Sequence, residues 1–461
     1  MRPSLLVAPE EAAQFLAGEQ PEPLLDPDEA LTLFRALLDL GIVVIDRERI
    51  EQIVRDVMAV SRSLPDAFEE VVAHLRARCL EVQISPSAYA ELSAEEVPED
   101  RLAAADSRIK PEVANVLQVV YDYRLQELGL RLPLEFVRVD GFSRPEIRLK
   151  LNDRTSPSVP IPGAAEVAVT TRPAQLEQFG IDARPLIDPL TGRESAAVPE
   201  AAVDRLEAAG VLPIPRVAYM AAAFARAATL DAYRVISIDD IEEDLAALEL
   251  NLPVLVHATL ARYSLGEITR LLRALARELV SIRDLRRILD ILLEFADATA
   301  EDLEESFLDD PLPRSGDRST PVWSSWVEPR LLAFVRARLR DRVCYDSGVY
   351  VNNGRAAVVH ETDAGFEDLI DLLTNSGGPQ ADELIHNVRA LAGEVLEEGE
   401  REPIFITAAR CRLSLRRAIE QEQPATRVLA RAELPAGVRL RHGAPLAAGG
   451  GLRADQTVRA K

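Results

Sequence analysis

Carboxylates occupy five of the six positions from 239 to 244, which makes this the densest group of potential ligands in the sequence. Carboxylate oxygens bind hard cations such as Ca²⁺ and Mg²⁺, but the spacing differs from that of an EF-hand loop and the glycine required there is absent. Acids in the first turn of a helix also complement the positive end of the helix dipole. The pattern favours this structural role, so we expect no metal site and no cofactor.

The other residues capable of chemistry are isolated. Asp188 begins the sequence Asp-Pro-Leu-Thr-Gly, which is first of all a turn. His257 and His386 lie within helical patterns, as structural histidines do. Cys411 lies between two arginines that would lower the pKa of its thiol, but no general base or second cysteine accompanies it. P-loop, GxGxxG and GxSxG motifs are absent as well, so we expect no catalytic residues and no enzyme; an enzyme with its site near Asp188 is a third alternative.

Bulk composition narrows the class of protein. A chain of 461 residues with 48% hydrophobic residues is long and apolar enough for two to four folded domains. Its net charge of −23 argues against a nucleic-acid partner, because nucleic-acid binding requires a basic surface. The three cysteines are far apart, which indicates a reducing compartment without disulfides or a zinc site.

No stretch of the sequence predicts a membrane span. The N-terminus lacks the charged and apolar regions of a signal peptide, and the most apolar stretch, 217–230, is interrupted by Arg226. We expect a soluble, cytoplasmic chain that is at most peripheral to a membrane complex.

Hydrophobic periodicity predicts an α+β multidomain fold, in which small mixed α/β subdomains surround a central bundle of short helices and follow a helical N-terminal region. Helical spacing is found at 29–78 and 111–128, separated by a connector at 82–110. Alternating patterns predict strands at 134–139, 146–151, 165–170 and 233–238. Capping-box spacing predicts helix starts at Ser237, Ser264, Ser281 and Thr299.

These elements divide the chain into seven expected parts. They are a helical N-terminal region (1–110), a first α+β subdomain (111–174 plus 236–255), an inserted second subdomain (175–235), a helical subdomain (256–308), a linker (309–325), a C-terminal α/β subdomain (326–447) and a flexible tail (448–461).

Charge is unevenly distributed along the chain. Residues 410–461 carry 11 Lys or Arg and 4 Asp or Glu, a local excess of seven positive charges in an acidic protein. A solvated basic face and tail is the simpler interpretation. A head-to-tail contact between this basic end and an acidic neighbour is the alternative.

One long stretch resembles a known family. Ser264-Leu265-Gly266, Glu278, the run Ile282-Arg283-Asp284-Leu285-Arg286 and the pair Ile288-Leu289 follow, without a gap, the most recognisable segment of the FHIPEP family of flagellar and type III secretion export gates. Weaker similarities keep the same order at 124–151, 180–192, 335–344 and 397–438. The resemblance covers about residues 111–447.

The resemblance implies a docking platform rather than an enzyme. In the family, four cytosolic subdomains follow a membrane part, assemble as a ring and receive export chaperones with their substrates. The membrane part has no counterpart in this sequence. The family's chaperone-docking motif, D-P-A-F-G, falls on Asp188 to Gly192, so that its Asp and Phe correspond to Asp188 and Thr191. Asp188 matches; Thr191 departs from the aromatic residue expected of an interface hot spot.

The N-terminal region also resembles part of the chain itself. Residues 29–54 align without a gap with residues 267–292, at a constant offset of 238, with 9 identities in 26 positions. An internal repeat of the helical unit is one interpretation, and a shared amphipathic pattern is the other.

Three functions follow as expectations. The first is a non-enzymatic docking or scaffold protein of secretion whose partners are export chaperones, substrates or other export components, and which forms a homo-oligomeric ring. The second is a repurposed cytosolic adaptor with the same fold and no role in secretion. The third is the enzyme with its site near Asp188.

Overall fold

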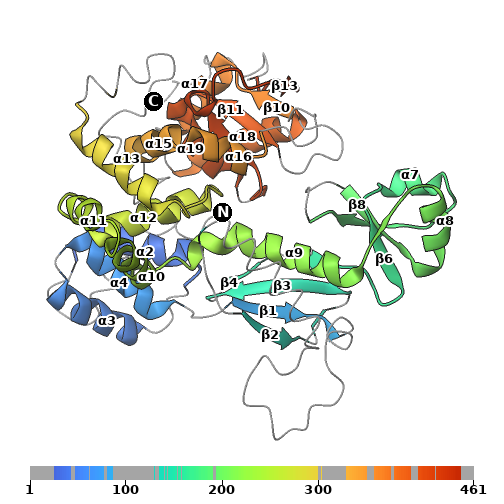
Figure 1. Cartoon of the computed structure of the whole chain (residues 1–461), viewed down its shortest axis with the longest axis horizontal. Helices are drawn as coiled ribbons and strands as arrows, with labels where there is room; N and C mark the ends of the chain where they lie inside the picture. Colours follow the sequence, from blue (N-terminus) through green and yellow to red (C-terminus); the bar gives the residue numbers. More distant parts are fainter. Residues whose placement is uncertain are drawn as a thin grey trace, which may run out of the picture. The chain divides into compact units, whose positions relative to one another are not determined.

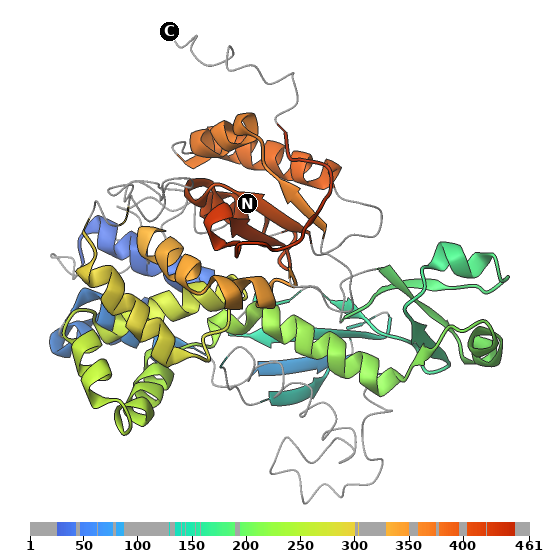
Figure 2. The same cartoon turned by 45° about the horizontal axis from the view of Figure 1, so that its top comes forward.

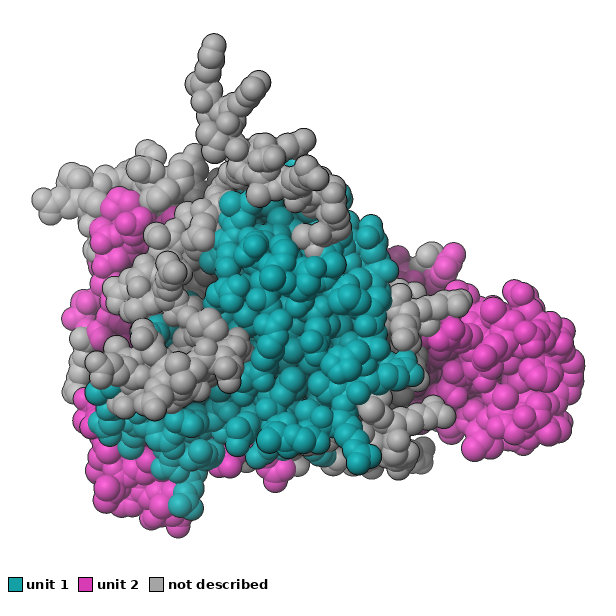
Figure 3. Space-filling model, turned by 90° about the horizontal axis from the view of Figure 1, so that it is seen from above, with its two compact units in different colours: residues 1–6, 286–461 teal, residues 7–285 magenta. Residues whose placement is uncertain are grey.

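The computed structural model describes a large part of the chain in two compact units. The described residues are 25–42, 47–61, 63–76, 80–86, 129, 134–139, 141–142, 144–152, 154–156, 158–189, 194–299, 303, 329–349, 358–374, 378–395, 403–420 and 422–447. One unit comprises residues 7–285, and the other comprises residues 286–461 with residues 1–6 (Figure 3). The expected linker at 309–325, the tail at 448–461 and the helix at 111–128 lie outside the described residues.

Helices from two distant parts of the sequence form one bundle in the unit 7–285. The N-terminal helices are α2 (Pro27–Asp39), α3 (Arg47–Val60) and α4 (Leu64–Leu75), and the later ones are α10 (Ile238–Glu249), α11 (Pro253–Leu260) and α12 (Leu265–Arg277). Helix α4 packs against α3, α10 and α12 (Figure 1). Gly266 permits the close approach, because a Cβ atom there would lie 2.6 Å from the Pro65 carbonyl.

A buried ion pair joins the two sets of helices. Glu69 of α4 is fully buried and accepts hydrogen bonds from Arg273 of α12 through both of its carboxylate oxygens, at 2.9 and 2.7 Å. Arg270 adds a third contact at 3.3 Å. A buried carboxylate needs this degree of pairing to offset its desolvation.

The first sheet of this unit has the order β2-β1-β3-β4, with β5 paired to β3. Its strands are β1 (Leu80–Ile84), β2 (Leu134–Arg138), β3 (Glu146–Leu151), β4 (Arg154–Thr155) and β5 (Val159–Pro160). Strand β1 is parallel to β2 and antiparallel to β3.

This sheet corrects the sequence-based assignment of residues 80–84. The connector predicted from residue 82 begins inside strand β1, and β2 and β3 are not neighbours joined by a hairpin, because β1 lies between them. The N-terminal region is therefore not purely helical. Pattern alone could not assign β1, because both of its partner strands lie far along the chain, beyond the whole of the expected connector.

The second sheet of the same unit is antiparallel, in the order β7-β8-β6-β9. Its strands are β6 (Glu166–Val169), β7 (Arg184–Ile187), β8 (Glu194–Pro199) and β9 (Pro213–Ile214), and it carries the short helices α7 (Pro173–Glu177), η4 (Glu200–Ala202) and α8 (Val203–Ala208). Leu176 and Leu206 of these helices pack onto Val169 and Val198 of the sheet. The second sheet thus includes β6, whose residues lie within the range 111–174 that the sequence assigns to the first subdomain.

The long helix α9 (Arg216–Asp231) packs against β3 of the first sheet and β6 of the second. Its buried face is rich in alanine, which lets the helix approach the strands closely. A 3₁₀ turn, η5 (Ala232–Arg234), continues it. The strand predicted at 233–238 is therefore wrong: the buried Arg234 side chain donates to the Asp39 carbonyl, and α10 begins at Ile238.

The unit 286–461 is built on a parallel sheet with the order β12-β11-β10-β13 (Figure 2). The strands are β10 (Val358–Glu361), β11 (Ile404–Thr407), β12 (Arg427–Ala430) and β13 (Arg441–His442). The helices are α13 (Leu285–Asp297), α15 (Pro329–Arg338), α16 (Arg340–Asp346), α17 (Ala364–Thr374), α18 (Gly378–Glu394), α19 (Ala409–Ile419) and the 3₁₀ turn η7 (Arg431–Glu433). Helices α17, α18 and α19 contact one another and cover a core that includes Phe366, Val388 and Phe405.

The α+β fold class is confirmed, with several small sheets among many helices. Ser237 with Asp240 and Ser264 with Glu267 form complete capping boxes. The third predicted start is displaced, because α13 begins at Leu285 and the Ser281 hydroxyl accepts from the Arg283 amide. The remaining subdomain boundaries stay predictions.

Candidate partner-binding site

Asp188 lies directly after strand β7 in the unit 7–285, and its side chain is buried. Strand β7 is at one edge of the second sheet, so this end of the strand lies at the rim of the sheet. Thr191, the second residue assigned from the family motif, lies outside the described residues. The turn predicted after Asp188 agrees with the end of β7 and the start of β8 at Glu194.

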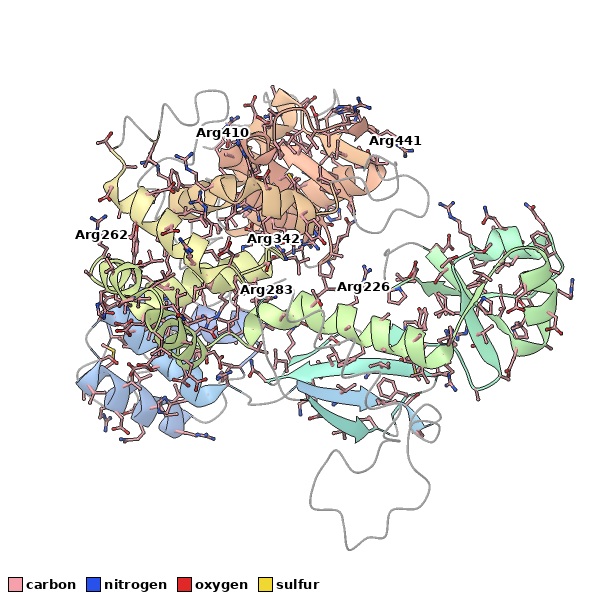
Figure 4. All side chains as sticks on the ribbon, in the orientation of Figure 1. Arg226, Arg262, Arg283, Arg342, Arg410 and Arg441 are labelled. Atoms are coloured by element: carbon pink, nitrogen blue, oxygen red, sulfur yellow. The ribbon has the colours of Figure 1, made fainter. Side chains whose placement is uncertain are left out.

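Helix α9 holds this end of β7 in place. The Tyr219 hydroxyl donates a 2.7 Å hydrogen bond to the Ile187 carbonyl. Arg226, which Figure 4 labels on α9, donates to the Pro189 carbonyl at 3.5 Å. Burial raises the pKa of Tyr219 to about 12, and the nearby charge of Asp188 acts in the same direction. Tyr219 therefore stays protonated and keeps its donor at neutral pH.

One ion pair and two hydrogen bonds to backbone carbonyls hold the beginning of the second sheet in place. Arg184 of β7 lies 2.6 Å from Glu166 of β6 and donates to the Ile161 carbonyl at 2.9 Å. Burial alone would raise the pKa of Glu166, but the hydrogen bonds from Arg184 and the Gly163 amide outweigh it, and the pKa is lowered. Arg216 at the start of α9 donates to the Pro162 carbonyl. These contacts join β7 to β6 and α9 to the segment before β6; we call the end of β7 at Asp188, with the part of α9 that contacts it, the Asp188 platform.

The surface at this platform is partly apolar. Ile187 precedes Asp188 and leaves 44% of its surface exposed, whereas Leu186 on the opposite side of β7 is buried. An exposed aliphatic side chain next to a fixed polar group suits contact with another protein better than chemistry.

A second apolar surface lies on α10 and α11, in the same unit. Leu250 follows α10 and Val254 lies in the first turn of α11; they expose 86% and 81% of their surfaces, and Leu260 exposes 42%. We call these three residues the α11 face. The sequence pattern does not reveal it, because the apolar residues of α11 are spread around the helix, and periodicity cannot separate a buried face from an exposed one in such a helix.

The candidate chemical residues do not form a reactive site in the described residues. The Asp240 carboxylate accepts from the Ser237 amide in the capping box of its own helix, and no group of three or more potential metal ligands occurs in the part of the chain that the structure describes. His257 and His386 are exposed rather than structural, and His257 pairs with Glu249 at 2.7 Å. These positions offer neither a coordination shell nor an acid–base pair directed at a common point.

The environment of Cys411 also differs from the lowered thiol pKa that its flanking arginines predict. Its thiol is fully buried on α19, 3.5 Å from a carboxylate oxygen of Asp371. Burial raises the pKa of Cys411, and Asp371 raises it further; the neighbouring Arg410 does not compensate. The arginines flanking Cys411 in sequence therefore do not make it a nucleophile, because Arg410 is engaged by Asp371 at 2.9 Å.

Among the described residues, none of the helices combines the length and the apolar character that crossing a bilayer requires.

The chain belongs to the FHIPEP family, whose sequence model matches residues 45–307. This match confirms the resemblance drawn from the motifs. No match was found among curated proteins.

Solved structures show the same fold. The CdsV protein of Chlamydia pneumoniae has 18% sequence identity and a TM-score of 0.56, covering 80% of this chain and 97% of its own. The MxiA protein of Shigella flexneri has 15% identity and a TM-score of 0.55, covering 80% of this chain and 98% of its own. The cytosolic domain of EscV from a type III secretion system, solved as a nonamer, has 14% identity and a TM-score of 0.52, with 80% and 97% covered.

Proposed function

We propose that this chain is a non-enzymatic docking platform of a type III secretion or flagellar export apparatus, located in the cytoplasm. The family match over residues 45–307 carries the proposal, and the fold shared with cytosolic domains of secretion proteins supports it. The partners would be export chaperones, their substrates or other export components. CdsV, which has this fold, has been solved in a complex with CdsO.

The Asp188 platform is the proposed partner-binding surface. Asp188 and Thr191 are its family-derived residues, and Ile187, next to Asp188 in the sequence, adds an exposed aliphatic group. Thr191 lacks the aromatic ring of the family motif, and aromatic residues dominate interface hot spots. Binding to an export chaperone with its substrate should therefore be weak in the native chain, and Thr191→Phe should strengthen it.

This binding is tested with the full chain and with chaperone–substrate complexes encoded in the same genome. Isothermal titration should show weak binding that Asp188→Ala abolishes and Thr191→Phe tightens by about 1–2 kcal/mol, or roughly 10-fold. The absence of binding to every such complex, with Thr191→Phe included, would favour the adaptor without a secretion role.

Self-assembly is the second part of the proposed function. EscV, with the same fold, forms a nonamer. The α11 face is our choice for the contact, because Leu250, Val254 and Leu260 are exposed apolar side chains on one helical hairpin. In a chain of net charge −23, apolar burial must outweigh the repulsion between copies.

A matched pair of valines tests this contact. Val254 exposes 81% of its surface and Val60, at the end of α3, exposes 75%. Light scattering after size-exclusion chromatography should give a mass that is a multiple of 50.7 kDa for the native chain. Val254→Asp should reduce that mass and Val60→Asp should leave it unchanged. A monomeric native chain at high concentration would refute self-assembly, and equal masses for all three proteins would refute the α11 face.

A further inference from the structure

Two pairs of helices begin at positions related by one constant offset. Helix α2 spans Pro27–Asp39 and α12 spans Leu265–Arg277; both have 13 residues, and adding 238 to the number of Pro27 gives that of Leu265. Helices α3 and α13 begin at Arg47 and Leu285, which are related by the same offset of 238. It is the offset that aligns the two sequences without a gap.

The helix starts have the same capping arrangement. Asp26 caps α2 and exchanges hydrogen bonds with Glu29, in a complete capping box. Ser264 caps α12 and exchanges the same two bonds with Glu267. The offset that relates the helices also relates the two caps and the two glutamates.

The helix ends agree in more detail. After α2, the amides of residues 40, 41 and 42 donate to the carbonyls of residues 36, 38 and 37. After α12, the amides of residues 278, 279 and 280 donate to the carbonyls of residues 274, 276 and 275, which is the same pattern at the same offset. Gly41 and Leu279 are the left-handed residues of these turns, with φ of 76° and 60°.

The left-handed leucine distinguishes a shared unit from a common motif. Capped amphipathic helices are frequent, but a leucine with positive φ is uncommon because its Cβ collides with the backbone. Glycine takes this conformation without strain, and glycine is the residue found at the equivalent position, 41. The turn at Leu279 therefore keeps a geometry that its own sequence does not favour.

Burial and charge repeat along the same register. The buried pairs are Leu33 with Leu271, Leu37 with Leu275, Ile42 with Val280, Ile50 with Ile288 and Val54 with Leu292. On the second helix, Arg287 forms an ion pair with Glu294 at 3.3 Å, and the equivalent positions hold Arg49 and Asp56. The equivalence thus includes side chains outside the core.

We propose that residues 26–42 and 264–280 are two copies of one capped helix with its C-terminal turn, and that the N-terminal copy is an intramolecular partner of the copy that carries the start of the family motif. The copies contact each other at equivalent positions: Asp39 Oδ2 lies 3.5 Å from Arg277 Nη1. When two copies are related by a two-fold axis, a residue that contacts the equivalent residue of the other copy lies at that axis. Here the counterparts have become opposite charges, so the contact is attractive.

A three-residue exchange tests the shared register in the full chain. Glu278→Leu, Leu279→Gly and Val280→Ile together place the Leu-Gly-Ile of positions 40–42 at the equivalent turn. The shifted control, Val280→Gly with Ser281→Ile, places the same tripeptide one residue later. Both exchanges put glycine in place of a side chain that is at most 3% exposed, Leu279 in the matched exchange and Val280 in the shifted one. Only the matched exchange also places glycine at the left-handed position, so it should melt at a higher temperature than the shifted exchange, which keeps leucine there.

A measurement that does not depend on the variants keeps the proposal open to refutation. In an experimental structure, the backbone hydrogen bonds of residues 274–280 and the positive φ of residue 279 should match those of residues 36–42. Equal melting temperatures of the matched and the shifted exchange, or a different turn at either position, would overturn the repeat. Neither outcome depends on self-assembly or partner binding.

Discussion

The Glu69 carboxylate is the best place to test how the N-terminal helices are joined to the family segment. It is fully buried on α4 and receives three contacts from two arginines of α12. The substitution Glu69→Gln keeps the size of the side chain and removes its charge. Arg273, whose Nη2 also donates to the Ile236 carbonyl at 2.7 Å, would remain buried without its counter-charge.

The expected loss of stability is large. Removing one partner from a buried ion pair typically costs about 3–5 kcal/mol, because the other charge remains desolvated. An independent estimate is similar, since two charges about 4 Å apart interact by about 4 kcal/mol at an effective dielectric constant of about 20. Burial lowers the pKa of Arg270 and the charge of Glu69 raises it, so this second arginine also loses a favourable interaction when Glu69 is neutralised.

Urea unfolding of the full chain, followed by circular dichroism, measures this loss. With a denaturant slope of about 2–3 kcal/mol/M, the midpoint of the transition that includes the helical bundle should fall by roughly 1–2 M. Hydrogen exchange should increase in peptides from both α4 and α12. The double variant Glu69→Met with Arg273→Met should be less destabilised than Glu69→Gln, because it leaves fewer unpaired buried charges.

The matched control is the pair Arg55 with Glu51 on α3, which is 2.6 Å long but has an exposed arginine. The substitution Arg55→Gln should cost less than about 1 kcal/mol. If Glu69→Gln were as mild as this control, or if the exchange of α12 did not change, the N-terminal helices would not be held to α12 by this ion pair and the reasoning would fail.

Three further predictions concern separate features. Gly266→Ala should destabilise the unit 7–285 by about 1–3 kcal/mol, because the new Cβ atom would lie 2.6 Å from the Pro65 backbone. The control Gly393→Ala, on the exposed part of α18 with free space around it, should stabilise the protein by about 0.5–1 kcal/mol. Thermal melting compares the two variants, and changes of the same sign would refute the close approach at Gly266. Burial raises the pKa of Cys344 to about 12, and burial together with Asp371 raises the pKa of Cys411. A thiol reagent at about pH 8 should therefore modify neither cysteine before the protein unfolds. Peptide mapping measures the labelling, and rapid labelling of either cysteine would contradict its burial. Burial raises the pKa of Glu367, but pairing with Arg431 and Thr362 outweighs it and lowers the pKa below 4.5, so Glu367 stabilises the unit 286–461 above pH 4.5 and this stabilisation is lost as the pH falls through the lowered pKa. The substitution Arg431→Met should therefore make the acid side of the stability curve shallower, and an unchanged slope would refute the assignment.

Local signals in the sequence predicted local structure well. The Ser237 and Ser264 capping boxes form as predicted because both partners lie within one turn of the helix. The turn at Asp188 was recognisable for the same reason. Family motifs extended this to the fold, since a colinear match carries information on long-range packing that composition does not.

Features that depend on distant partners were not predictable from the sequence. Strand β1 is only five residues long, and what makes it a strand is pairing with β2 and β3. In the sequence, the two flanking arginines indicated a lowered pKa for the Cys411 thiol. The pKa is raised instead, because the packing of α17 against α19 buries the thiol and places Asp371 beside it and beside Arg410. The α11 face was missed because exposure is a property of the packed bundle rather than of the helix.

The central place of β1 has a consequence for any shortened form of this protein. A chain that started after residue 85 would lose the strand between β2 and β3, and each would be left with a row of unsatisfied backbone donors and acceptors. Open strand edges of this kind recruit strands from other molecules and lead to aggregation. The N-terminal segment is therefore a condition for solubility of the part that carries the family motif, and its removal should be visible as precipitation before any loss of binding is measured.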